Sequence, residues 1–124
     1  MKIIRTLMVD DSPEFIEAAQ RFLETDPSIE VIEYVHYGKD ALDRIRSLQP
    51  DLVLLDINMP DVNGLEVLRQ VREYAHPPKV IILTLYDNIE YQKKAKKLDA
   101  DGFVQKYDFG VELLPLIHSL FADN

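Results

Sequence analysis

The chain has 124 residues, a mass of 14.4 kDa and a formal net charge of -8. This length suits one domain over residues 1–124, and a composition of 47% hydrophobic and 29% charged residues excludes a disordered chain. The negative charge argues against direct nucleic-acid binding, no apolar run approaches the roughly 20 residues of a membrane span, and the lack of cysteine excludes disulfides and fits the cytoplasm.

Strand-like and helix-like patterns alternate along the whole chain. In the first half we expect a strand at 3–9, a helix at 13–25, a strand at 30–35, a helix at 41–48 and a strand at 52–55. In the second half we expect a helix at 65–72, a strand at 80–83, a helix at 88–98, a strand at 102–104 and a helix around 113–120.

Particular residues mark the limits and the places of these elements. Ser12 is suited to cap the first helix, and Pro13 is suited to its first position. The strand at 30–35 is irregular, as near a sheet edge, whereas 52–55 is continuously apolar and is expected to be central and buried. Pro115 lies inside the last helix, where it should cost about 3 kcal/mol or bend the helix.

The alternation of strands and helices predicts the fold class. Such βαβ units, joined by right-handed crossovers, form a parallel sheet that helices cover on both faces. We therefore expect an α/β protein with a doubly wound, five-stranded parallel sheet and five helices. Ligands of such folds bind outside the carboxyl ends of the strands, near the point where the strand order reverses.

Polar residues end the expected strands at that edge of the sheet. They are Asp10 and Asp11 after the first strand, Asp56 after the third, Thr84 after the fourth and Lys106 after the fifth. Three carboxylates in a small space repel one another unless they share a divalent cation with oxygen ligands, and Mg²⁺ suits this best. Asp56 could then attack a phosphoryl group, with Lys106 and the Thr84 hydroxyl stabilising the phosphoryl oxygens.

These residues resemble those of response-regulator receiver domains of bacterial two-component systems, over essentially the whole chain. The resemblance rests on Asp10 and Asp11, the run 54–60 with Gly64 beyond it, Thr84, and Lys106 after Phe103 and Val104. It implies a flavodoxin-like receiver fold and a signalling switch activated by phosphorylation.

The resemblance also implies a role for each residue of the site. Asp56 is the phosphoacceptor. The implied Mg²⁺ ligands are Asp10, Asp11, Asp56 and the carbonyl of Asn58. Thr84 and Lys106 bind the phosphoryl group, and Phe103 is the aromatic residue whose rotation accompanies the movement of Thr84. Because Phe103 lacks a hydroxyl group, a core role is as well supported as a switch role.

The implied partners are a sensor histidine kinase or phosphotransfer protein, and an effector domain or downstream protein. Segments 26–42 and 84–87, and a Lys106 not followed by proline, resemble receivers that precede LuxR-type DNA-binding domains. The chain is either part of such a regulator or a stand-alone receiver. The kinase is expected to meet the first helix around Phe15, Ile16 and Ala19, and phosphorylation is expected to favour a homodimer. The chain is not expected to be an enzyme beyond its own phosphorylation and autodephosphorylation.

Some features depart from the common receiver pattern or lie outside it. Leu85 is bulky and could restrict access of a phosphoryl donor to Asp56, and Tyr86 and Asn58 occupy positions that tune the lifetime of the acyl phosphate, so dephosphorylation is expected to be slow. A basic run at 93–97 reads as a solvated helix face or a contact for an acidic partner. An apolar belt at 113–121 reads as core with an excess suited to a dimer or effector contact.

Three other functions are weighed against the receiver hypothesis. A receiver-shaped module that signals without phosphorylation is consistent with the departures at Leu85 and Pro115, but the complete set of acids, threonine and lysine argues against it. An aspartate-nucleophile phosphatase resembles this site but carries a second Asp where this chain has Asn58, and an amide cannot transfer the proton. A nucleotide-binding domain would need a Gly-rich phosphate loop after the first strand.

Overall fold

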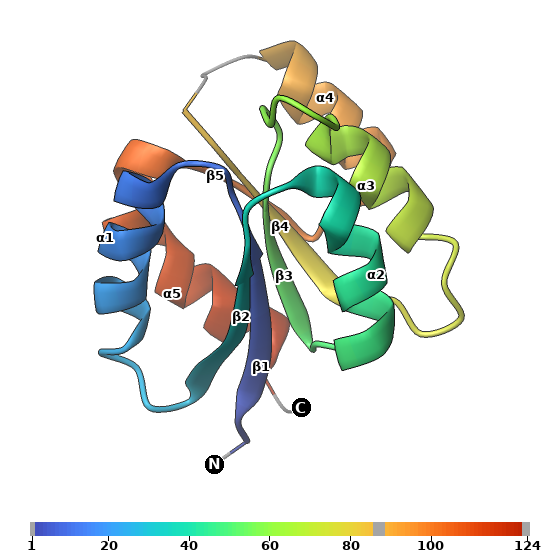
Figure 1. Ribbon diagram of the computed structural model, residues 1–124. Helices are drawn as coiled ribbons and strands as arrows, with labels where there is room; N and C mark the ends of the chain where they lie inside the picture. Colours follow the sequence, from blue (N-terminus) through green and yellow to red (C-terminus); the bar gives the residue numbers. More distant parts are fainter. Residues whose placement is uncertain (1, 86–88, 123–124) are drawn as a thin grey trace.

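The computed structural model describes residues 2–85 and 89–122 and shows a single parallel sheet covered by helices (Figure 1). The first six elements are β1 (Ile4–Val9), α1 (Pro13–Leu23), β2 (Ile29–Val35), α2 (Gly38–Leu48), β3 (Leu52–Asp56) and α3 (Gly64–Val71). They are followed by β4 (Lys79–Thr84), α4 (Ile89–Lys97), β5 (Gly102–Gln105), a short 3-10 helix η1 (Lys106–Asp108) and α5 (Phe109–Leu120). The strand order β2-β1-β3-β4-β5, all parallel, confirms the predicted fold class.

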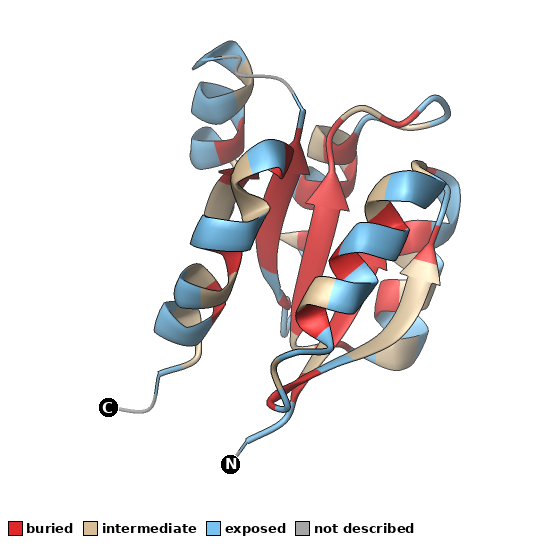
Figure 2. Ribbon diagram, turned by 90° about the vertical axis from the view of Figure 1, so that its left-hand side faces the viewer, coloured by how far each residue is buried: buried red, intermediate tan, exposed pale blue. Residues whose placement is uncertain are grey.

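The sheet separates two layers of helices, with α1 and α5 on one face and α2, α3 and α4 on the other (Figure 1). Alternate side chains of each strand point to opposite faces, so each central strand contributes to both layers. In β3, Val53 and Leu55 join the core under α2, α3 and α4, whereas Leu52 and Leu54 join the core under α1 and α5. The sheet is therefore buried on both sides, as Figure 2 shows for its central strands.

The edge and centre of the sheet lie where the sequence patterns place them. All five residues of β3 are buried, which confirms that this strand is central. β2 pairs only with β1 and is mostly half-buried, and the pairing register shifts between Thr6 and Leu7. The predicted cap of α1 is also confirmed, because the Ser12 hydroxyl accepts a hydrogen bond of 3.3 Å from the Phe15 N–H.

Several predicted limits shift by a few residues. α1 ends at Leu23 rather than near Thr25, because Thr25 turns back through its N–H and hydroxyl to the Phe22 carbonyl. β5 extends to Gln105, and the sequence patterns gave no sign of η1. The expected start of the fourth helix at Asn88 lies outside the described residues.

Pro115 does not end the last helix, which continues from Phe109 to Leu120. A residue with an N–H at this position would donate to the carbonyl of Val111, four residues earlier. Val111 is 79% exposed, so water can hydrogen-bond to the carbonyl that Pro115 leaves without its helical donor. The predicted cost of Pro115 is thus moderated by its place on the solvent side of α5.

Within the described residues, no helix is both long and apolar enough to cross a membrane.

Candidate functional site

Three of the predicted site residues, Asp10, Asp11 and Asp56, converge at the carboxyl edge of the sheet, next to β1 and β3. The chain runs from β1 outward to β2 and then returns across the sheet to β3, so the strand order reverses between these two neighbours. Asp10 follows β1 and Asp56 ends β3 at this point. Carboxylate oxygens of Asp10, Asp11 and Asp56 all lie within 4.8 Å of one another.

Two of the three acids are withdrawn from solvent. Asp10 is 1% exposed and Asp56 is 4% exposed, while Asp11 is more open to solvent. The Ser12 N–H donates to Asp10 Oδ1 at 2.8 Å, and the Asn58 N–H donates to Asp56 Oδ1 at 3.2 Å. Each buried carboxylate is therefore oriented by the backbone two residues further along the chain.

Lys106 supplies positive charge to this acidic cluster. Its Nζ lies 2.6 Å from Asp10 Oδ2 and 3.7 Å from Asp56 Oδ2, and its side chain is only 5% exposed. Apart from this ion pair, Asp10 Oδ2 has no hydrogen-bond partner within residues 2–85 and 89–122. One ammonium thus faces two buried carboxylates and is closer to Asp10.

Electrostatics at Asp56 favour its neutral form. The pKa of Asp56 is raised to about 6, first by burial and then by the charges of Asp10 and Asp11, against the opposing effects of Lys106 and the Asn58 N–H. The Lys106 ammonium does not fully neutralise the three carboxylates, so this cluster is suited to bind a cation.

The donor set fits a magnesium ion. Mg²⁺ takes oxygen ligands, commonly one or two carboxylates together with water and substrate oxygens. The oxygens of Asp10, Asp11 and Asp56 form such a group, and Asn58 directly follows Ile57 at the same rim. Within the part of the chain that the structure describes, Asp10, Asp11 and Asp56 are the group that could hold a metal.

The start of α3 requires Gly64. A Cβ on Gly64 would lie 2.2 Å from the carbonyl oxygen of Asp56, and the Gly64 N–H donates to the Ile57 carbonyl at 2.9 Å. The helix therefore begins directly against the backbone that carries the acidic residue. Gly64 thus allows the close approach of α3 to the end of β3.

Thr84 is the last residue of β4, and Phe103 lies within β5. Leu83 pairs with Asp56 in register, so Thr84 extends β4 one residue beyond it; Thr84 is fully buried. Phe103 pairs with Ile82 and lies half-buried against the core under α2, α3 and α4. It also lines a cavity of about 320 Å³ between α4 and β5.

Phe15 joins the site although no sequence pattern assigned it there. The Lys106 ammonium lies 4.4 Å from the centroid of the Phe15 ring. The expectation that Phe15, Ile16 and Ala19 meet a kinase needs correction, since Ile16 and Ala19 are buried under the sheet face. Helical spacing shows which residues share a face of α1, but it does not show that the Phe15 ring lies next to Lys106, the first residue of η1.

The other features that depart from the common receiver pattern or lie outside it are found after β4, in α4 and in α5. Leu85 is 62% exposed at the end of β4, and Tyr86 lies outside the described residues. The lysines at 93–97 are all exposed, as expected for a solvated helix face. In the apolar belt, Leu113 and Ile117 are buried and the other members are half-buried against the core.

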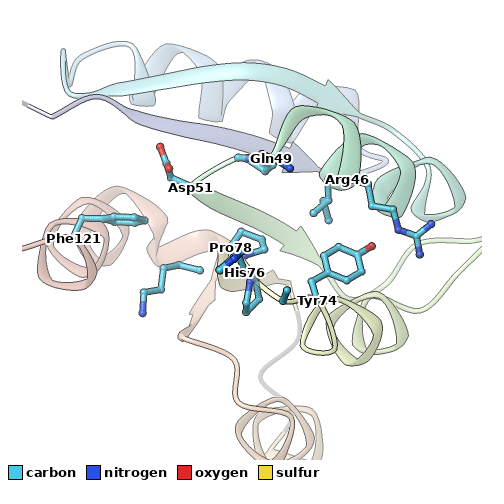
Figure 3. Close-up of a pocket in the computed structure, with 12 residues that line it drawn as sticks. Arg46, Gln49, Asp51, Tyr74, His76, Pro78 and Phe121 are labelled. Carbon is cyan, nitrogen blue, oxygen red and sulfur yellow. The ribbon is translucent and has the colours of Figure 1, made fainter.

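A pocket of about 570 Å³ lies at the opposite, amino end of the sheet (Figure 3). It is lined by side chains from the end of α2, the segment before β4 and the end of α5, including Arg46, Tyr74, His76 and Phe121. It contains none of the residues of the acidic cluster. The chemistry predicted from the sequence therefore belongs to the carboxyl rim and not to this pocket.

Known proteins with the same features identify the family. The model of the response regulator receiver domain matches residues 6–116. The chain is 39% identical over 106 residues to protein-glutamate methylesterase/protein-glutamine glutaminase 1 of Methanospirillum hungatei, covering 84% of this chain and 31% of that protein. It is 32% identical over 116 residues to the nitrate/nitrite response regulator NarL of Escherichia coli, covering 94% of this chain and 54% of that protein.

Solved structures agree with this result. The structure of a LuxR-family DNA-binding response regulator from Staphylococcus aureus matches with a TM-score of 0.89 and 30% identity, covering 95% of this chain and 98% of that chain. The chain belongs to the response regulator receiver domain family of two-component systems and is similar to the receivers of LuxR-family regulators. It spans about a third to a half of the curated relatives named above.

Proposed function

We propose that the chain is a phosphorylation-activated signalling switch whose phosphoacceptor is Asp56. The observation that carries this proposal is the position of Asp56, a carboxylate that is 4% exposed, beside two further acids and 3.7 Å from the Lys106 ammonium. Such a group is reachable at a strand end, yet it is surrounded by charges able to stabilise a phosphoryl group.

Asp10, Asp11 and Asp56, with the carbonyl of Asn58, would hold Mg²⁺. When bound, the ion neutralises the negative charge of the carboxylates and of the phosphoryl oxygens. It would also lower the pKa of Asp56, against the burial that contributes most to raising it to about 6.

The protein groups then have separate tasks in the transfer. A carboxylate oxygen of Asp56 attacks phosphorus, and an O–P bond forms as the bond between phosphorus and the donor breaks, with the electron pair leaving on the donor. The Asn58 N–H orients the Asp56 carboxylate. Lys106 moves its ammonium from Asp10 toward a phosphoryl oxygen, and the Thr84 hydroxyl donates a hydrogen bond to another.

The output would be read on the face formed by α4, β5 and α5. Phe103 lies half-buried beside the cavity between α4 and β5, so its ring has space to move when Thr84 shifts. The partners would be a sensor histidine kinase or phosphotransfer protein, and an effector domain or downstream protein in the cytoplasm. Similarity to LuxR-family receivers favours a DNA-binding effector, and phosphorylation would favour a homodimer.

The test is the intact mass of the chain after incubation with Mg²⁺ and acetyl phosphate, in parallel with Asp56→Asn. We expect one labile phosphoryl adduct on the wild type, and none on the variant or without Mg²⁺. Absence of an adduct with several donors and kinases would reject this function and favour a module that signals without phosphorylation. Steady release of phosphate from an external phosphoester would instead indicate a phosphatase.

A further inference from the structure

Lys106 has a third neighbour besides the two carboxylates. The face of the Phe15 ring lies 4.4 Å from Nζ, measured to the ring centroid. With Asp10 Oδ2 at 2.6 Å and Asp56 Oδ2 at 3.7 Å, the ammonium has one aromatic and two anionic neighbours. Because the side chain is only 5% exposed, these groups replace most of the water that would surround a free ammonium.

The Phe15 ring is fixed in place from two directions. Its backbone lies in the first turn of α1, where the Ser12 hydroxyl accepts the Phe15 N–H. Its ring packs edge to face on Phe109 at 5.2 Å between centroids, and Phe109 packs in the same way on Phe22 at 5.1 Å. Phe109 is the first residue of α5, three residues after Lys106. The ring is thus held by both helices on this face of the sheet.

We propose that Phe15 is a positioning residue for Lys106, holding the ammonium by its ring face at the rim between Asp10 and Asp56. This inference rests on the proposed function and adds a residue to it. A ring face attracts a cation without forming a directed hydrogen bond. Lys106 can therefore exchange the carboxylate of Asp10 for a phosphoryl oxygen on Asp56 while it keeps its contact with the ring.

The same arrangement connects the site to α1 and α5. Movement of Lys106 would change its contact with the Phe15 ring, and that ring contacts Phe109 at the start of α5. This connection does not involve Phe103, which lies on the other face of the sheet. It requires no polar group on an aromatic residue.

The test compares three variants of the aromatic cluster. Phe15→Leu retains apolar volume but removes the ring face, and Phe15→Tyr retains the ring face. Phe22→Leu is the matched control, because Phe22 is on the same helix and, like Phe15, packs edge to face on Phe109, while the ring next to the Lys106 ammonium is that of Phe15. The measured quantity is the rate of phosphoryl adduct formation with Mg²⁺ and acetyl phosphate, with urea unfolding of each variant.

We expect Phe15→Leu to slow adduct formation by about threefold to thirtyfold, the range given by the strength of a cation–π contact, with Phe15→Tyr and Phe22→Leu within about twofold of the wild type. Equal rates for Phe15→Leu and Phe22→Leu would overturn the inference while the proposed function stands. Equal slowing by Phe15→Leu and Phe15→Tyr would overturn it as well, because the ring face would then not matter.

A second measurement needs neither metal nor phosphoryl donor. In the NMR spectrum of the metal-free wild type, the Phe15 ring should shift the Lys106 ε-methylene protons upfield, and Phe15→Leu should return them toward ordinary lysine values. Unshifted protons in the wild type would overturn the inference even if a variant failed to fold. If the shift is present but no adduct ever forms on the wild type, the proposed function fails and the contact stands as structural.

Discussion

Aspartates lie at both ends of the sheet, but their partners differ. At the amino end, Asp51 precedes β3 and Asp101 precedes β5. Asp51 Oδ2 accepts the Arg5 N–H at 2.9 Å while its own N–H donates to the Arg5 carbonyl at 2.8 Å. Asp101 repeats this arrangement with Val80, at 2.8 Å for each bond. Each carboxylate thus extends the ladder between two neighbouring strands.

The carboxyl end has the opposite balance of charge and partners. Asp10 and Asp56 share one ammonium, and Asp11 adds a third negative charge nearby. At the amino end, Asp101 Oδ2 accepts the Val80 N–H and also pairs with the guanidinium of Arg72, whose Nη2 lies 3.0 Å away. Because unpaired buried charge costs stability, the imbalance at the carboxyl end has no structural benefit and is instead suited to binding a cation and a phosphoryl group.

The largest expected effect comes from removing the Lys106 ammonium, the one cation of the acidic rim among residues 2–85 and 89–122. In metal-free protein at pH 7.5, Lys106→Met should lower the free energy of unfolding by about 3 kcal/mol, since it leaves buried acids without a counter-charge. The loss should shrink at pH 5, where protonation of Asp56 relieves it. Urea unfolding in EDTA at both pH values measures this effect.

Lys79→Met is the matched control for that experiment. Lys79 is at the amino end, its side chain is 48% exposed and its Nζ lies 3.9 Å from Asp101 Oδ1. An exposed pair of this kind contributes about 0.5 kcal/mol or less, so this variant should be near the wild type. Equal losses in the two lysine variants would contradict the contrast between the ends of the sheet.

At the amino end, the largest effect should come from Asp101→Ala. It leaves the buried N–H of Val80 without its acceptor and leaves Arg72 with the Pro78 carbonyl but without its carboxylate partner, at an expected cost of about 2 kcal/mol in urea unfolding. The rate of phosphoryl adduct formation in the folded variant should stay within twofold of the wild type. A large decrease in the rate of adduct formation without a loss of stability would show that Asp101 acts in the phosphoryl transfer and does not mainly stabilise the sheet.

The roles of these two ends could be predicted to different degrees from the sequence. Asp56 ends a continuously apolar run, and Asp10 and Lys106 also follow strand-like runs, so the parallel fold was enough to bring them to one rim. Asp51 and Asp101 precede strands and could be read as ordinary loop residues. Their bonds depend on which strands are neighbours, and that order does not follow from local patterns.

Side-chain contacts between distant segments also escaped prediction. Phe15 carries the apolar signature of a core residue, and nothing local to residue 15 indicates an ammonium from residue 106. η1, the 3-10 helix that separates Lys106 from α5, had no pattern of its own because it is a single short turn. The geometry that brings these residue types together into a site therefore lies in tertiary packing.

The one substitution expected to increase stability is Asp56→Asn. Burial raises the pKa of Asp56 to about 6, above its ordinary value near 3.8, so the folded state binds a proton more tightly than the unfolded state. The wild type therefore loses stability as pH rises from about 4 to about 6, and the amide does not. Metal-free Asp56→Asn should match the wild type near pH 4 and exceed it above pH 7, by no more than about 3 kcal/mol, the equivalent of a shift that already includes the opposing effect of Lys106.

Urea unfolding of both proteins in EDTA across this pH range gives the difference directly. Asp51→Asn is the control at the other end of the sheet. The Asp51 carboxylate accepts the Arg5 N–H, so the protein should lose stability at neutral pH when this residue is substituted. The two substitutions of the same kind should thus change stability in opposite directions. If Asp56→Asn were also destabilising at pH 7, the acidic rim would be a structural cluster with balanced charges. It would then not have the excess negative charge that suits it to bind a cation and a phosphoryl group.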